Sequence, residues 1–251
     1  MNSFIGWIGG KKLLRKEIVN RIPENFGRYV EVFGGAAWVL FAKDKHADME
    51  VYNDANGDLV NLYRCIKYHC QELQRELSYM LNSRELFEAF KVQYNVTGMT
   101  DIQRAARFFM LIKTSYGSDS RSFGCVKKDV SNMILYLEKI QERLSKVVIE
   151  NRDFERLIRI YDKPDAVIYL DPPYFGTEKY YDAEFSYDDH KRLHRTLQNT
   201  NGKFILSYND CDFIRELYKD FKIDEISRCH NLAGKYEHKP HIYKELIIKN
   251  Y

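Results

Sequence analysis

Short runs of β-branched and aromatic residues recur along this chain between stretches with helical periodicity. Seven of them predict strands, at residues 29–33, 50–54, 147–149, 166–170, 203–207, 221–226 and 243–248. Alternation of strands with helical segments favours a mainly parallel sheet with helices on both faces. The last two strands are joined by a loop at 228–241 without a helix, so we expect them to be antiparallel. The predicted fold class is α/β, a doubly wound, mainly parallel, seven-stranded Rossmann-like sheet with an antiparallel last strand.

The stretch between the second and third predicted strands has no strand signal. From residue 61 to 136, apolar side chains recur at helical spacing, for example Ala105, Phe108 and Ile112. We therefore expect a helical insertion, and because no flexible linker flanks it, we expect it to pack against the sheet. The predicted domains are residues 1–60 with 137–251, and the insertion at 61–136.

Composition places the chain in the soluble globular class. Hydrophobic residues make up 45% and charged residues 30% of its 251 residues. No apolar run approaches the ~20 residues that a membrane span needs, and the start of the chain is too short and glycine-broken for a signal peptide. The five cysteines are scattered without a C-x-x-C pair, which favours a reduced, cytoplasmic compartment. A net charge of +3 neither requires nor forbids a polyanionic partner.

The fourth predicted strand ends in a stiff, chemically distinctive loop, Asp171, Pro172, Pro173 and Tyr174. Two consecutive prolines hold the backbone extended and remove two N–H donors. The loop presents the Asp171 carboxylate, the Pro172 carbonyl and the flat face of Tyr174. A planar ring with an amino group can stack on the tyrosine and donate its amino hydrogens to the two oxygens. The alternative is an ordinary exit from a strand.

A glycine pair follows the first predicted strand. Phe33, Gly34 and Gly35 precede residues 36–41, where we expect a helix to start, so a ligand can approach the backbone at a helix N-terminus. Asp54 follows Gly34 by 20 residues, at the end of the second strand. An acid at that offset commonly binds ribose hydroxyls, which predicts an adenosine-containing cofactor. The strict G-x-G-x-x-G pattern of NAD sites is absent, and a simple tight turn is the alternative.

Two further elements surround these. Trp7, Gly10 and Lys11 precede a predicted helix, where Lys11 can reach a carboxylate and Trp7 can pack on an apolar stem, or the lysine is simply solvated. Asp153 and Phe154 follow the third strand. Asp153 can accept a hydrogen bond from an adenine amino group while Phe154 stacks nearby, or it can cap the next helix; the two roles are compatible.

Taken in order, these elements resemble the Dam-type (D12 class, alpha group) DNA adenine methyltransferases, which use S-adenosylmethionine. The matching segments are W-x-G-G-K at 7–11, an E-x-F-x-G-type loop at 31–35, N-D-x-N at 53–56, N-x-D-F at 151–154, D-P-P-Y at 171–174, a strand at 204–207 and a closing segment at 245–251. The resemblance spans essentially the whole chain, and the order of seven motifs is far more specific than any one of them.

The resemblance implies a site-specific enzyme that moves a methyl group from S-adenosylmethionine to N6 of an adenine flipped out of duplex DNA. The implied catalytic residues are Asp171, Pro172, Pro173 and Tyr174. The implied cofactor-binding residues are Trp7, Gly10, Lys11, Phe33, Gly34, Gly35, Asp54, Asp153, Phe154 and Asp171. Two oxygen acceptors favour a pyramidal amino nitrogen, so the chemistry needs neither a covalent nucleophile nor a metal.

The insertion would be the target-recognition domain. Between residues 98 and 128, six Lys and Arg face two Asp, a plausible phosphate footprint or merely a solvated surface. The predicted DNA-contacting residues are Arg107, Lys113, Ser115, Tyr116, Arg121, Ser122 and Lys127. Arg121 can read a guanine edge or only a phosphate. The segment lacks the asparagine- and arginine-rich hairpin usual in enzymes that read GATC, so the recognition sequence stays open.

Other interpretations of the sequence remain. Methylation of RNA adenine or DNA cytosine is a rival activity, and a catalytically silent DNA-binding module is a rival from another class. Cys229, His230, His238 and His241 are too irregularly spaced to predict a zinc site. We expect a monomer or weak dimer on DNA, in a bacterial or phage setting. Whether the enzyme pairs with a restriction endonuclease, travels on a phage or acts in housekeeping stays open.

Overall fold

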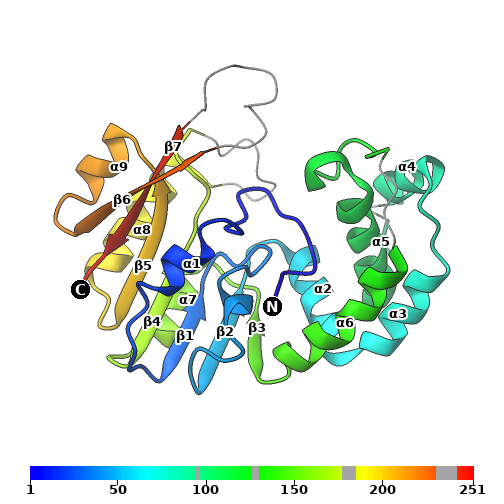
Figure 1. Cartoon of the computed structure of the whole chain (residues 1–251), viewed down its shortest axis with the longest axis horizontal. Helices are drawn as coiled ribbons and strands as arrows, with labels where there is room; N and C mark the ends of the chain where they lie inside the picture. Colours follow the sequence, from blue (N-terminus) through cyan, green and yellow to red (C-terminus); the bar gives the residue numbers. More distant parts are fainter. Residues whose placement is uncertain (94–95, 126–129, 177–184, 230–241) are drawn as a thin grey trace.

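A seven-stranded sheet forms the centre of the computed structural model, which describes residues 1–93, 96–125, 130–176, 185–229 and 242–251 (Figure 1). The strands are β1 (Arg28–Glu31), β2 (Met49–Asn53), β3 (Val147–Glu150), β4 (Ala166–Leu170), β5 (Lys203–Asn209), β6 (Lys222–Cys229) and β7 (Ile242–Lys249). Their spatial order is β3-β2-β1-β4-β5-β7-β6. β1 to β5 pair in parallel, and β7 is antiparallel to both neighbours. The predicted fold class is confirmed.

Helices cover both faces of the sheet. They are α1 (Arg15–Val19), α2 (Gly57–Tyr68), α3 (Cys70–Ser78), α4 (Arg84–Val92), α5 (Asp101–Thr114), α6 (Val130–Leu144), α7 (Phe154–Tyr161), α8 (Tyr187–Gln198) and α9 (Asp212–Leu217), with short 3₁₀ turns η1 (Leu40–Ala42) and η3 (Tyr116–Ser118). Alternate residues of β4 feed two cores: Val167 and Tyr169 pack with α2 and α5, whereas Ile168 and Leu170 pack with α7 and α8. Among the helices the structure describes, none is long and apolar enough to cross a membrane.

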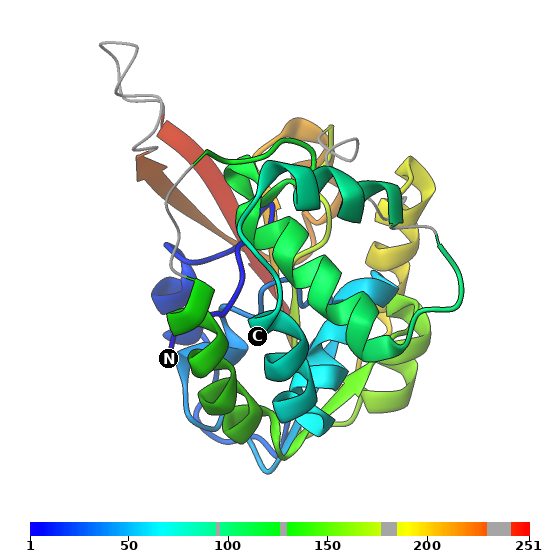
Figure 2. The same ribbon diagram turned by 90° about the vertical axis from the view of Figure 1, so that its right-hand side faces the viewer.

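The helical lobe between β2 and β3 stands beside the sheet and faces the viewer in Figure 2. Its described helices run from Gly57 to Leu144, wider than the predicted 61–136 at both ends. The lobe shares one continuous core with the sheet. A buried ion pair at 2.7 Å between Arg143 of α6 and Glu50 of β2 also joins them. The lobe is therefore packed against the sheet, as the absence of a linker predicted.

The prediction that a helix starts at residues 36–41 is wrong. The backbone turns instead, because Gly35 and Ala37 adopt positive φ angles of 49° and 53°, which interrupt α-helical geometry. Only the three-residue η1 follows, at Leu40–Ala42. The glycine pair is thus followed by a compact turn, and the expected ligand approach at a helix N-terminus does not apply here.

Candidate active site

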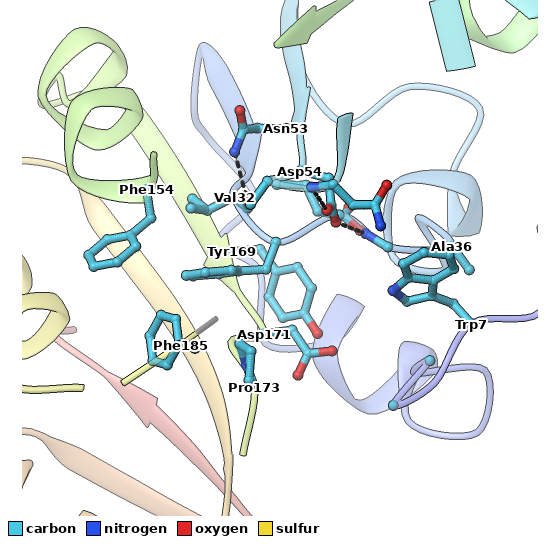
Figure 3. Close-up of a pocket in the computed structure, with 18 of the residues that line it drawn as sticks. Trp7, Val32, Ala36, Asn53, Asp54, Phe154, Tyr169, Asp171, Pro173 and Phe185 are labelled. Carbon is cyan, nitrogen blue, oxygen red and sulfur yellow. Dashed lines mark hydrogen bonds between the residues drawn. The ribbon is translucent and has the colours of Figure 1, made fainter. Parts of the chain in front are cut away.

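One cavity lies at the carboxyl ends of the central strands, and the predicted cofactor-binding residues meet on its wall (Figure 3). Its lining includes all ten of them: Trp7, Gly10, Lys11, Phe33, Gly34, Gly35, Asp54, Asp153, Phe154 and Asp171. Of the remaining predicted catalytic residues, Pro173 lines the cavity too. Residues as far apart in the chain as Trp7 and Pro173 converge here, because parallel strands bring their carboxyl ends to one edge.

The glycine turn forms one wall and is fixed by neighbouring side chains. Asp54 Oδ2 accepts a hydrogen bond of 2.8 Å from the Gly35 N–H, and its other oxygen accepts from Asn56 N. A Cβ on Gly34 would meet the Tyr52 ring at 2.2 Å, so only glycine fits there. Burial raises the pKa of Asp54, opposed by these N–H donors. Asp54 therefore holds the turn in shape while it borders the cavity.

A buried cation and a carboxylate meet at one end of the cavity. Lys11 Nζ lies 2.6 Å from Asp171 Oδ1, and the lysine side chain is only 5% exposed. Ser207 Oγ of β5 donates to the same carboxylate at 2.9 Å. Burial raises the pKa of Asp171, and Lys11 and Ser207 oppose that effect. Lys11 thus reaches a carboxylate, as its sequence position predicted.

The tyrosine of the same loop is anchored by the closing strand. Tyr174 OH donates to Glu245 Oε2 of β7 at 2.7 Å. Lys11 Nζ lies 4.6 Å from the centre of the Tyr174 ring. Burial, reinforced by Asp171 and Glu245, raises the pKa of the phenol well above its usual value, so Tyr174 is a neutral donor. Pro172 and Pro173 are buried beside it.

Glu31, at the end of β1, is a further carboxyl on the cavity wall. It is 2% exposed, and Tyr29 OH donates to its Oε2 at 2.8 Å. Burial raises the pKa of Glu31 to about 8, against the opposing hydrogen bond from Tyr29. The side chain is therefore largely protonated at neutral pH.

The opposite end of the cavity is aromatic and acidic. The rings of Phe33, Phe154 and Phe185 lie within 5.8 Å of one another, centre to centre, and Figure 3 shows Phe154 and Phe185 side by side. Asp153 caps α7 by accepting from the N–H groups of Glu155 and Arg156, so the predicted capping role is confirmed.

Sequence reasoning missed three residues at this end: Phe185, Asp189 and Arg192. Arg192 of α8 pairs with Asp153 at 2.7 Å. Burial works to raise the pKa of Asp153, but the Arg192 guanidinium and the cap donors outweigh it and lower the value. The available signal was the first turn of a helix that begins soon after the D-P-P-Y loop, with its Ser186–Asp189 capping box.

The predicted DNA-contacting residues divide by exposure. Tyr116, Arg121 and Ser122 are exposed in one loop of the helical lobe. Arg107 donates to Gln93 Oε1 at 2.8 Å and borders a second, small cavity. Ser115 is buried and donates to Ile112 O, so its side chain does not face a partner. Lys113 packs its amine over the Phe109 ring, and Lys127 lies outside the described residues.

No group of three His, Cys, Asp or Glu that could hold a metal ion occurs in the part of the chain that the structure covers. His230, His238 and His241 fall outside that part, and so does the side chain of Cys229.

A glycine turn, an acid after the second strand and a cation-paired carboxylate thus border one cavity at one edge of the α/β sheet. The family model of the D12 class N6 adenine-specific DNA methyltransferases matches residues 7–232. The chain belongs to this family, as its motifs predicted, and is therefore an enzyme of the adenine-specific DNA methyltransferase type.

Curated relatives align along nearly the whole chain. The type II methyltransferase M1.LlaDCHI of Lactococcus lactis subsp. cremoris is 28% identical and is covered over 96% of its length by 100% of this chain. The type II methyltransferase M.MjaIII of Methanocaldococcus jannaschii is also 28% identical, with 100% of this chain and 99% of that protein covered. The retron Ec67 DNA adenine methylase of Escherichia coli is 27% identical over 88% of this chain and 82% of its own length.

Proposed function

We propose that this chain transfers the methyl group of S-adenosylmethionine to the exocyclic N6 amino group of an adenine in duplex DNA. One observation carries the proposal: the Asp171 carboxylate opens onto the same cavity that the glycine turn and Asp54 line. A donor site and an acceptor for an amino group therefore adjoin within one pocket.

The cavity residues fit such a cofactor. The aromatic end offers Phe33, Phe154 and the Asp153 carboxylate to an adenine ring and its amino group. Asp54 and the backbone of Gly34, which carries no Cβ, suit a ribose. Trp7 and Lys11 lie at the other end, where an amino-acid tail would bind. When bound, S-adenosylmethionine supplies an electrophilic methyl group on a sulfonium.

Asp171 prepares the amino nitrogen for attack. An aromatic amine is a weak nucleophile, because its lone pair is delocalised into the ring. By accepting an amino hydrogen, the carboxylate favours a pyramidal nitrogen and can take the proton that this nitrogen must lose. Lys11 at 2.6 Å favours the ionised form of Asp171 against its burial. Tyr174 offers an aromatic ring for stacking, worth ~1–3 kcal/mol per base in nucleic-acid sites.

Access to the cavity requires that the adenine leave the helix, since a paired base cannot reach a pocket at the edge of a sheet. The loop that carries Tyr116, Arg121 and Ser122 lies close to Gly6, where an added Cβ would meet Ser118 Oγ of that loop at 2.3 Å. Gly6 directly precedes the cavity residue Trp7. We therefore infer that this loop meets DNA near the cavity, and that Arg107, Lys113 and Lys127 add phosphate contacts.

Methyl transfer from radiolabelled S-adenosylmethionine to duplex DNA, followed by mapping of the modified base, tests the proposal. We expect N6-methyladenine at one short sequence, and no product from Asp171→Ala. A thermal-shift titration of the same proteins with S-adenosylmethionine reports cofactor binding separately. Label in cytosine or only in RNA would overturn the proposed substrate. The proposed activity would be overturned if S-adenosylmethionine neither stabilised the protein nor donated its methyl group to DNA.

A further inference from the structure

Arg192 lies at the aromatic end of the cavity and forms a bidentate ion pair with the Asp153 carboxylate. Nη1 donates to Oδ1 at 2.9 Å and Nη2 donates to Oδ2 at 2.7 Å. Such paired hydrogen bonds fix the plane of the carboxylate as well as its position. Arg192 lies on α8 and belongs to none of the sequence motifs that carried the family resemblance.

The guanidinium has three further contacts among the described residues, of which one is with Glu155, whose Oε2 accepts from Nη1 at 3.3 Å. Asp189 Oδ1, one turn earlier on α8, accepts from Arg192 Nε at 3.1 Å and from Nη2 at 2.9 Å. The guanidinium carbon lies 4.0 Å from the centre of the Phe154 ring. Asp189 in turn is fixed by its capping box with Ser186. Arg192 thus ties together the two side chains that would meet a purine, Asp153 and Phe154.

The two carboxylate oxygens of Asp153 differ in how many further hydrogen bonds they can accept. Oδ1 accepts from Glu155 N, Arg156 N and Arg192 Nη1. Among the contacts of the described residues, Oδ2 accepts only from Arg192 Nη2. The acceptor capacity of Oδ1 is therefore used up, whereas Oδ2 has two lone pairs and a single donor, so it keeps one acceptor position. The two hydrogen bonds from Arg192 fix the orientation of the carboxylate and therefore the direction of this free lone pair.

We propose that Arg192 is a positioning residue that makes the cavity select a cofactor whose purine carries a 6-amino group over one with a 6-carbonyl. The inference rests on the proposed function, because it takes the purine of the cofactor to bind at Asp153. A fixed, ionised Asp153 carboxylate accepts a hydrogen bond from a 6-amino group and repels a 6-carbonyl oxygen. When the arginine is removed, Asp153 loses one donor on each oxygen, so its carboxylate plane is no longer fixed and the free lone pair of Oδ2 is no longer aimed at an amino group.

Because the Arg192 and Asp153 side chains are partly exposed, a role in ligand selectivity can be distinguished from a role in folding stability. The Arg192 and Asp153 side chains are 32% and 36% exposed, and exposed ion pairs contribute little to folding. We therefore expect Arg192→Met to unfold at nearly the wild-type temperature. A change in ligand selectivity without a change in stability is a result that a merely structural arginine would not give.

Calorimetric titration with S-adenosylhomocysteine and with its inosine analogue tests the proposal. We expect the wild type to prefer the adenosine compound by roughly a hundredfold or more, since a site built to pair with a polar group strongly rejects its mismatch. Arg192→Met should reduce that ratio by roughly tenfold or more, and Arg192→Lys by less, because lysine keeps a single charge-assisted bond. Arg195→Met on the exposed side of the same helix is the matched control and should keep the wild-type ratio.

An unchanged ratio in Arg192→Met, in protein that unfolds at the wild-type temperature, would overturn the role of Arg192 and leave the proposed function intact. A wild type that binds neither compound would instead contradict the proposed cofactor site. Equal loss of both ligands in Arg192→Met would also count against selectivity, because it would mean that the arginine only shapes the cavity.

Discussion

The two ends of the cavity each hold a carboxylate beside a cation, yet their surroundings differ. Lys11 and Asp171 meet at 2.6 Å with side chains 5% and 16% exposed, whereas Arg192 and Asp153 meet at 2.7 Å in a more open position. Burial dominates at the first pair and raises the pKa of Asp171. At the second pair, hydrogen bonds overcome burial and lower the pKa of Asp153.

The difference suggests two uses for a carboxylate beside a cation: proton transfer in a buried site and ligand recognition in a more open one. A carboxylate whose charge is held against burial can accept a proton in a reaction. A carboxylate locked in its ionised form by a planar guanidinium is suited to orientation and selection. We therefore propose that the reaction takes place at the Lys11 end and that the cofactor purine is recognised at the Arg192 end.

The largest expected effect concerns Glu31, which belongs to the buried end. Its folded pKa of about 8 exceeds the ordinary value of 4.5, so the folded protein binds this proton more tightly than the unfolded chain. The free energy of unfolding should therefore fall as the pH rises from about 4.5 to about 8, by an amount on the order of 5 kcal/mol. Urea denaturation across this range should show a flatter profile for Glu31→Gln.

Asp153→Asn is the matched control for that experiment. Because the folded pKa of Asp153 is lowered, its contribution to stability is lost only as the pH falls below its ordinary value. Its profile above pH 5 should follow the wild type. If Glu31→Gln has the same slope as the wild type, the two ends do not differ in the way described.

Removal of each cation should cost different amounts of stability. Lys11→Met leaves the Asp171 charge in a buried site, for which losses of about 3–5 kcal/mol are typical. Arg192→Met breaks a more exposed pair, for which about 1 kcal/mol or less is expected. Denaturant unfolding at one pH measures both. Equal losses would show that burial does not separate the two pairs.

The aromatic rings should separate transfer from cofactor binding. Tyr174→Ala removes a stacking ring and should weaken transfer by the equivalent of ~1–3 kcal/mol, while Phe154→Ala should instead weaken cofactor binding. Tyr174→Phe keeps the ring but loses the hydrogen bond to the Glu245 carboxylate, worth about 1.5–3 kcal/mol of folding stability, and should keep most activity. Steady-state kinetics in DNA and in cofactor distinguish these outcomes. A loss in Tyr174→Phe as large as in Tyr174→Ala would assign the effect to the hydroxyl.

The smallest expected effect is a shift in the pH profile. Lys11 opposes the burial that raises the pKa of Asp171, so without it the carboxylate should protonate at higher pH. Transfer by Lys11→Met should then be roughly tenfold slower at pH 7 and recover as the pH rises. Arg192→Met should keep the wild-type profile, and a shift in both variants would contradict separate ends.

Much of this site could be predicted from the sequence, because it rests on strand ends. Apolar runs locate β1, β2 and β4, and the residues after them must converge at one edge of a parallel sheet. Gly34, Asp54 and Asp171 were predictable for this reason. The sequence also predicted that Lys11 can reach a carboxylate, and the structure identifies that carboxylate as Asp171.

The remaining features depend on information that local sequence does not carry. The positive φ of Ala37, which excludes the expected helix, arises from the packed turn around it. Arg192 lies in a helix whose exposed face reads as ordinary solvated charge. The burial of Ser115 and the exposure of Tyr116 differ by one position, and the count of Lys and Arg in the lobe cannot tell them apart.

The division between the two ends is tested most directly by Asp171→Asn and Asp153→Asn, each measured for cofactor affinity and for the single-turnover rate of methyl transfer at saturating cofactor. We predict that Asp171→Asn slows transfer by roughly 10²–10³-fold with affinity changed by less than about tenfold, and that Asp153→Asn does the reverse. A normal transfer rate in Asp171→Asn, or a loss confined to cofactor affinity, would contradict the assignment of the reaction to Asp171.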